Sequence, residues 1–156
     1  RFLKTKAREI GKQNVRLKAI GRLDMLPART QKALDRTITD TAANDGLTLV
    51  LALSYGSREE IVDATKAIAE RVHSGELLAE EITREVISNH LYTSDCPDPD
   101  LLIRTSGEFR LSNFLLWQLS YAEIFISLKN WPDFKKSDFH EAVADYARRH
   151  RRFGRL

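Results

Sequence analysis

The sequence lacks the features of secreted and membrane-spanning proteins. Its 156 residues include one cysteine, Cys96, so no disulfide can form within the chain. No apolar run reaches the roughly 18 to 20 residues of a membrane-spanning helix, and the first residues do not resemble a signal peptide. We therefore expect a cytoplasmic protein that does not cross a membrane. Peripheral contact with a membrane surface stays compatible with the sequence.

Internal repeats, low-complexity tracts and flexible linkers are absent as well. With 42% hydrophobic and 30% charged side chains, the chain has the composition of a protein that buries one core. We expect a single domain over residues 1–156.

Positive charge is in small excess overall but is concentrated at the C-terminus. The net charge is +3, and the basic residues of the tail are Arg148, Arg149, His150, Arg151, Arg152 and Arg155. Such a tail is either a solvated helix end that complements the helix dipole or a binding element for an anion. Zinc-finger spacing, an aromatic RNA-binding signature and a clear helix-turn-helix are missing, so we expect no nucleic acid as a partner.

Apolar patterns and turn signals predict a strand, a helix and a second strand in the first third of the chain. Residues 14–21 alternate as a short strand does. The apolar run 47–53 suits a parallel strand that is covered on both faces. Apolar residues at helical spacing between Pro27 and residues 44–46 indicate a helix that connects them.

The rest of the chain continues this alternation. The predicted elements are a helix from a capping box at residues 57–60, a short helix near 82–87, strands at 101–103 and 123–127, and a helix over 137–152. The last helix carries Phe139, Val143 and Tyr146 on one face. The fold class is therefore α/β, with a largely parallel central sheet flanked by helices. Because residues 1–13 read as a helix without a start signal, we expect the N-terminal part of this fold to be missing.

The residues that follow the strand at 101–103 predict an anion site. Ligands of parallel sheets bind beyond the carboxyl ends of the strands, and the segment there contains Arg104, Thr105, Ser106, Gly107, Arg110 and Ser112. Arginine forks match phosphate oxygens, hydroxyl groups add donors, and glycine allows a close turn around a ligand. A helix that starts near residues 112–113 would add its free N–H groups. These residues together suit a diphosphate ligand.

Other interpretations of these residues stay open at this point. The arginines could pair with neighbouring carboxylates in a structural network, namely those of Asp98, Asp100 and Glu108. The apolar segment 114–119, taken as a helix, is either core or a wall for a long apolar ligand. Glu123 is a surface residue, an arginine partner or, beside a diphosphate, a magnesium ligand.

One continuous segment carries a resemblance to a known family: Arg104-Thr-Ser-Gly-Glu-Phe-Arg-Leu-Ser-Asn-Phe-Leu-Leu-Trp-Gln-Leu-Ser-Tyr-Ala-Glu123. It closely resembles the C-terminal signature of the cis-prenyltransferases, of which undecaprenyl diphosphate synthase is the bacterial example. The resemblance extends to residues 14–21, 53–61, 131–134 and 151–154, and so covers essentially the whole chain.

The resemblance implies an activity and a set of site residues. These isoprenyl transferases use Mg²⁺ to condense isopentenyl diphosphate onto an allylic prenyl diphosphate with formation of cis double bonds. By the resemblance, the residues that bind isopentenyl diphosphate would be Arg104, Arg110, Leu111 and Ser112. Glu123 would be a magnesium ligand. Arg152 and Gly154 would reach a substrate diphosphate near the interface of a homodimer.

The sequence departs from the family in one respect. The family's N-terminal motif, with a magnesium-binding aspartate in a glycine-rich loop, has no counterpart here. We therefore expect the catalytic residues upstream of Arg1 and an inactive chain when the 156 residues are taken alone. Two alternatives are a noncatalytic subunit of a heteromeric cis-prenyltransferase and a basic nucleic-acid-binding α/β module, whose binding would fall steeply with salt.

Overall fold

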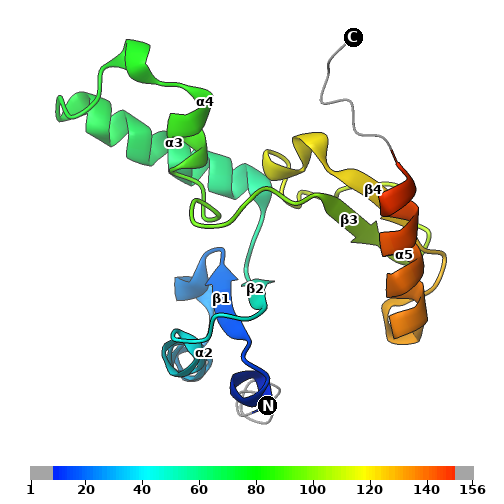
Figure 1. Cartoon of the computed structure of the whole chain (residues 1–156). Coiled ribbons are helices and arrows are strands. Elements are labelled where there is room, and N and C mark those ends of the chain that lie inside the picture. Colours follow the sequence, from blue (N-terminus) through cyan, green and yellow to red (C-terminus); the bar gives the residue numbers. More distant parts are fainter. Residues whose placement is uncertain (1–8, 150–156) are drawn as a thin grey trace. The chain divides into compact units, whose positions relative to one another are not determined.

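The computed structural model describes residues 9–149 (Figure 1). Contacts within the chain divide it into two compact units, Arg1–Asp95 and Cys96–Leu156. Each unit contains one pair of parallel strands together with helices, so the α/β prediction is confirmed. A single domain over residues 1–156 stays a prediction. None of the helices within residues 9–149 is long and apolar enough to span a bilayer.

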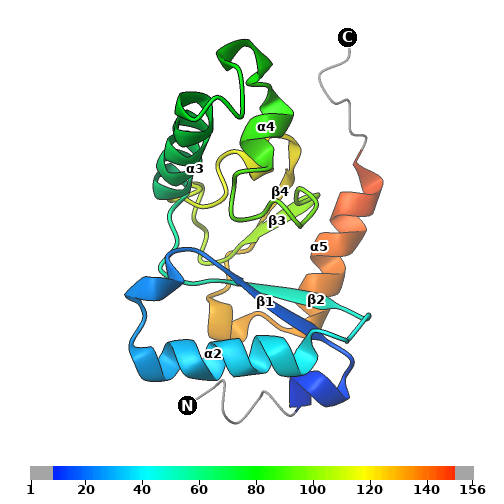
Figure 2. The same cartoon turned by 90° about the vertical axis from the view of Figure 1, so that its left-hand side faces the viewer.

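The first unit contains the predicted strand–helix–strand arrangement. Its elements are β1 (Arg16–Ile20), η1 (Leu23–Met25), α2 (Ala28–Thr41), β2 (Thr48–Ala52), α3 (Ser57–His73), η2 (Ala79–Glu81) and α4 (Arg84–Ser88), and residues 9–12 are helical. β1 and β2 are parallel, and α2 connects them and packs against β1 (Figure 2). Leu17 of β1 and Leu34 of α2 are buried. The Leu17 N–H donates to Oγ1 of Thr41 at 3.1 Å, which fixes the end of α2 to the strand.

The position directly after β1 suits only glycine. Gly21 has φ +110, and a Cβ atom there would lie 2.1 Å from the carbonyl oxygen of Leu53. That carbonyl cannot easily move, because the Leu53 N–H donates to the carbonyl of Ile20 at 2.9 Å. A side chain at position 21 would therefore separate the ends of the two strands.

Two predictions for this unit are wrong. β2 is not covered on both faces, since Leu49, its second residue, is 37% exposed. The reason is that α2, the helix that connects the two strands, packs against β1 and covers β2 less well. α3 begins at Ser57 itself, with Gly56 in the N-cap position. Ser57 therefore lies one residue too late to form the predicted capping box.

Carboxylates of α3 bind three other segments of the first unit. Buried Glu60 accepts hydrogen bonds from the Tyr55 hydroxyl at 2.5 Å and from the Tyr92 N–H at 2.9 Å. Asp63 accepts two from Arg22, at 3.0 and 2.8 Å, and one from the Tyr92 hydroxyl. The bonds from Arg22 and then Tyr92 lower the pKa of Asp63. This network joins the residue after Gly21, the turn after β2 and the segment after α4.

The second unit contains both remaining predicted strands. Its elements are β3 (Leu101–Arg104), η3 (Gln118–Tyr121), β4 (Glu123–Ile126), η4 (Trp131–Asp133) and α5 (Lys136–Arg148). β3 and β4 are parallel, and α5 contacts β4 (Figure 1).

The apolar segment 114–119 is not the helix that we expected. Ser112, Asn113 and Leu115 have φ values of +52, +61 and +46. Left-handed backbone at non-glycine residues does not continue as a right-handed helix, so only η3 forms, from Gln118 onward. The segment therefore offers no helix N-terminus at residues 112–113 to an anion.

The buried residues of α5 do not lie on the face that carries Phe139, Val143 and Tyr146. Phe139 and Val143 are 50% and 42% exposed, whereas Asp138 and Ala142 are buried. Asp138 accepts a bond from Nζ of Lys129 at 2.6 Å and one from a backbone N–H just before the helix at 2.7 Å. The bond from Lys129 and then that from the backbone lower the pKa of Asp138, and together they satisfy the buried carboxylate.

Candidate functional site

A pocket of about 270 Å³ lies on one face of the β3–β4 pair. Its lining residues are Leu102, Arg104, Glu108, Phe109, Arg110, Leu111, Ile124 and Ile126. Every second residue of a strand points to the same face, and the register sets Leu102 beside Ile124 and Arg104 beside Ile126. The loop residues 108–111 complete the pocket. Apolar strand residues therefore lie next to charged loop residues.

Backbone hydrogen bonds hold the start of this loop beside the end of β4. The Ser106 N–H donates to the Lys129 carbonyl at 2.8 Å, and the Gly107 N–H donates to the Ser127 carbonyl at 2.9 Å. Gly107 has φ +66, and a Cβ atom there would lie 3.3 Å from Cδ2 of Leu128. Both N–H groups are thus used within the fold. The glycine serves this junction, and its N–H is not available to a ligand.

The two arginines of the pocket differ in their partners. Nη1 of Arg110 forms an ion pair with Oε2 of Glu108, so the structural network that we considered exists for this arginine. Arg104 has no ion pair within residues 9–149. Two arginines and one glutamate leave the pocket with one net positive charge, which favours an anion with an apolar part.

The structure brings together some of the predicted site residues. Arg104, Arg110 and Leu111 line the pocket, whereas exposed Ser112 is not among the lining residues. Glu123 is one residue out of phase with Ile124, so its side chain belongs to the opposite face of the strand pair. The predicted residues Arg152 and Gly154 lie outside the described residues.

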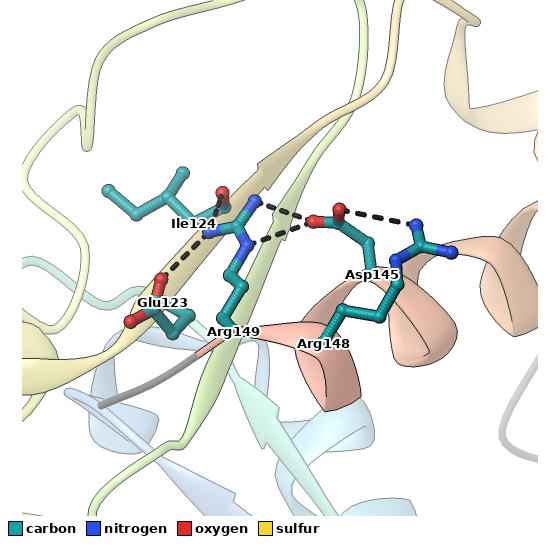
Figure 3. A network of polar contacts seen from close by, with 5 residues as sticks. All are labelled: Glu123, Ile124, Asp145, Arg148 and Arg149. Atoms are coloured by element: carbon teal, nitrogen blue, oxygen red, sulfur yellow. Dashed lines mark hydrogen bonds and ion pairs between the residues drawn. The ribbon is translucent and has the colours of Figure 1, made fainter.

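Glu123 is bound by an arginine at the end of α5 (Figure 3). Nη1 of Arg149 donates to Oε2 of Glu123 at 2.8 Å and to the Ile124 carbonyl at 3.1 Å. Its Nε and Nη2 donate to Oδ2 of Asp145 at 2.9 and 2.6 Å. These bonds, first that to Glu123, raise the pKa of Arg149. α5 ends at Arg148 rather than at the predicted residue 152, because Arg149 has extended backbone.

The described residues alone do not form a metal cage. Residues 9–149 contain no group of three or more His, Cys, Asp or Glu side chains that could hold a metal ion. Glu123 offers hard carboxylate oxygens, which suit Mg²⁺, and this ion commonly takes only one or two protein carboxylates beside phosphate oxygens and water. The chemistry of Glu123 therefore fits Mg²⁺ in the presence of a phosphate ligand.

The apolar part of the pocket was not predicted. Leu102, Ile124 and Ile126 were assigned to strands but not to a site, and Phe109 was not singled out. The available signal was the two-residue period of side chains along a strand, since it sets Leu102 and Arg104 on one face.

Comparison with protein families gives one match over nearly the whole chain. The sequence model described as "Putative undecaprenyl diphosphate synthase" matches residues 1–154. The chain belongs to this family. A protein named isoprenyl transferase, from Halalkalibacterium halodurans, is 49% identical over 154 residues, which are 99% of this chain and 60% of that protein. The ditrans,polycis-undecaprenyl-diphosphate synthase ((2E,6E)-farnesyl-diphosphate specific) of Micrococcus luteus is 48% identical over 155 residues, with 99% and 62% covered.

Two solved structures are similar to this chain in fold and in sequence. The crystal structure of lavandulyl diphosphate synthase from Lavandula x intermedia, in complex with dimethylallyl diphosphate, matches with a TM-score of 0.95 and 39% identity, over 98% of this chain and 66% of that chain. A probable undecaprenyl diphosphate synthase from Campylobacter jejuni matches with a TM-score of 0.85 and 37% identity, over 98% and 69%. The chain spans about 60% of the length of the first curated relatives.

Proposed function

We propose that this chain supplies the isopentenyl diphosphate site of a cis-prenyltransferase, an enzyme that condenses isopentenyl diphosphate onto an allylic diphosphate with formation of cis double bonds. The observation that carries the proposal is the pocket of Arg104 and Arg110 beside Leu102, Ile124 and Ile126. Arginines suit a diphosphate, and aliphatic side chains suit an isoprenyl group. The names of the relatives support the same reaction class.

The size of the pocket favours the smaller of the two substrates. Pockets for drug-sized ligands commonly measure roughly 300 to 1,000 Å³, and this one measures about 270 Å³. A five-carbon diphosphate suits that volume better than a long polyprenyl chain does. Isopentenyl diphosphate is therefore the proposed occupant, with its phosphates at the arginines and its carbon chain along the strand residues.

In the proposed mechanism, the pocket holds and orients the nucleophile. Arg104 and Arg110 bind the diphosphate of isopentenyl diphosphate, so that its double bond is held toward the allylic carbon of the second substrate. The double bond forms the new carbon–carbon bond while the allylic carbon–oxygen bond breaks and diphosphate leaves. Transfer of a proton to the released diphosphate or to water then gives the new cis double bond. Positioning by the two arginines is the contribution that this chain's described residues make.

Magnesium belongs to the same proposal. Glu123 would contribute a carboxylate oxygen to the ion, and its other ligands would be water and oxygens of the departing allylic diphosphate, since Glu123 lies on the face opposite the pocket. The bound ion would stabilise negative charge on the departing diphosphate. Glu123 would first have to leave Arg149, its present partner. A homodimer that uses Arg152 and Gly154 also belongs to this proposal and rests on the sequence resemblance. A cytoplasmic location belongs to it too and rests on the single cysteine and the lack of a long apolar run.

Labelled isopentenyl diphosphate tests the proposal in two assays. We expect the 156-residue chain to bind it, and a chain extended to the length of its relatives to incorporate it into a farnesyl diphosphate primer when Mg²⁺ is present. We expect no incorporation by the 156 residues alone, because the chain spans about 60% of those relatives. A folded chain that binds no isopentenyl diphosphate would contradict the site assignment. An extended chain that binds it without turnover would favour the noncatalytic subunit instead.

A further inference from the structure

Glu108 is an unusual member of a pocket that is proposed to bind an anion. Its carboxylate repels a diphosphate, yet it lines the same pocket as Arg104 and Arg110. The side chain is 33% exposed and its Oε2 contacts Nη1 of Arg110. A negative charge at this position lowers anion affinity unless it has a second effect that outweighs the repulsion.

The two arginines of the pocket differ in how firmly the fold fixes them. Arg104 is the last residue of β3, and the hydrogen bond from the Ser127 N–H to its carbonyl, at 2.7 Å, fixes its backbone. Arg110 lies in a loop without helix or strand, and its side chain is 66% exposed. A long side chain on such a loop samples many rotamers, and ordering it reduces the affinity for any ligand that needs one of them.

We propose that Glu108 is a positioning residue that holds the guanidinium group of Arg110 in the pocket for the diphosphate. This inference rests on the proposed function of the pocket. The ion pair uses Nη1 of Arg110, so Nε and Nη2 keep their N–H groups for phosphate oxygens. Glu108 therefore acts through Arg110 and does not itself contact the anion.

Removal of Glu108 has opposite expected effects under the two interpretations. A simple counter-charge weakens anion binding, so its removal raises the pocket's net charge from one to two positive charges and tightens binding. A positioning residue strengthens binding, so its removal weakens binding despite the added positive charge. The sign of the change therefore distinguishes the two.

The experiment is calorimetric titration of the 156-residue chain with inorganic diphosphate at low ionic strength. We expect Glu108→Ala to weaken binding about threefold to fivefold, in the range measured for partly exposed ion pairs. Glu108→Gln keeps an amide oxygen that can accept from Arg110, so it should weaken binding less. Glu141→Ala is the matched control, because it removes one carboxylate from the exposed side of α5 and does not line the pocket.

A double-mutant cycle with Arg110→Ala adds a readout that a merely structural role would not change. Once Arg110 is absent, only the repulsion by Glu108 remains, so Glu108→Ala should then tighten diphosphate binding. Unchanged or tighter binding by Glu108→Ala in the presence of Arg110 would overturn the inference, as would equal weakening with and without Arg110. Failure of the unsubstituted chain to bind isopentenyl diphosphate or diphosphate would instead overturn the proposed function.

Discussion

Two arginine clusters in this molecule differ in how completely they are paired. In the first unit, Arg22 donates two hydrogen bonds to Asp63, which also accepts one from Tyr92. In the second unit, Arg104 has no ion pair within the described part of the chain, and Arg110 has one carboxylate partner. Asp63, which binds Nε and Nη2 of Arg22 and the Tyr92 hydroxyl together, joins three segments and so stabilises the fold. Arginines with donors to spare, in a pocket, are available to a ligand.

The largest expected effect that tests this comparison is on ligand affinity. Arg104→Ala and Arg110→Ala should each weaken isopentenyl diphosphate binding by about 10- to 150-fold, because hydrogen bonds to charged groups contribute about 1.5–3 kcal/mol. Calorimetric titration measures the affinity. Arg36→Ala serves as the control, since it removes the same charge from an exposed i,i+4 pair with Asp40. Equal affinity in both pocket variants and the parent chain would refute the site.

The next effect should be on stability and not on binding. Asp63→Ala leaves Arg22 and Tyr92 without their shared acceptor, and we expect the free energy of unfolding to fall by about 1–2 kcal/mol, a value reduced for partial exposure of the carboxylate. Urea unfolding measures the change. Asp40→Ala, which breaks only the exposed pair with Arg36, should cost less than about 0.5 kcal/mol. If Asp63→Ala also weakened diphosphate binding, the first cluster would contribute to binding as well, which would contradict the comparison.

Acidification should remove part of the stabilisation that Asp63 provides. The bonds from Arg22 and Tyr92 depress the pKa of Asp63 in the folded state. Its stabilising effect is therefore fully present above the unfolded pKa, about 3.9, and is lost as pH falls through the folded value. Urea unfolding at a series of pH values from 7 to 3 should show a shallower decline for Asp63→Asn than for the parent chain. If the free energy of unfolding fell equally with pH in the two proteins, the hydrogen bonds of Asp63 would not contribute to stability.

Local signals account for most of the fold that was predicted. β1, β2, β3, β4 and α2 were placed to within two or three residues because alternation, apolar runs and turn residues lie within each segment. The break at residues 112–115 had only a weak signal in Asn113, since left-handed backbone there occurs also at serine and leucine and not at glycine.

Long-range pairing accounts for what was missed. Buried Asp138 is bound by Lys129 from the segment between β4 and η4, and the apolar periodicity within α5 contains no signal for this bond. Arg104, Arg110 and Leu111 were predicted from residue type, but the apolar half of the pocket depends on the register between β3 and β4. The partner of Glu123 lies 26 residues further along the chain.

The smallest expected effect concerns Arg149, which is more fully paired than Arg110 but lies at the surface. Its side chain is 34% exposed, and exposed ion pairs contribute little because water and salt screen them. Arg149→Ala should therefore lower the free energy of unfolding by at most about 1 kcal/mol. Because Glu123 belongs to the face of β4 opposite the pocket, isopentenyl diphosphate affinity without Mg²⁺ should change less than about twofold. A tenfold loss of affinity would mean that Arg149 and the pocket are coupled across β4. The number of partners of an arginine would then not distinguish a structural arginine from a ligand-binding one.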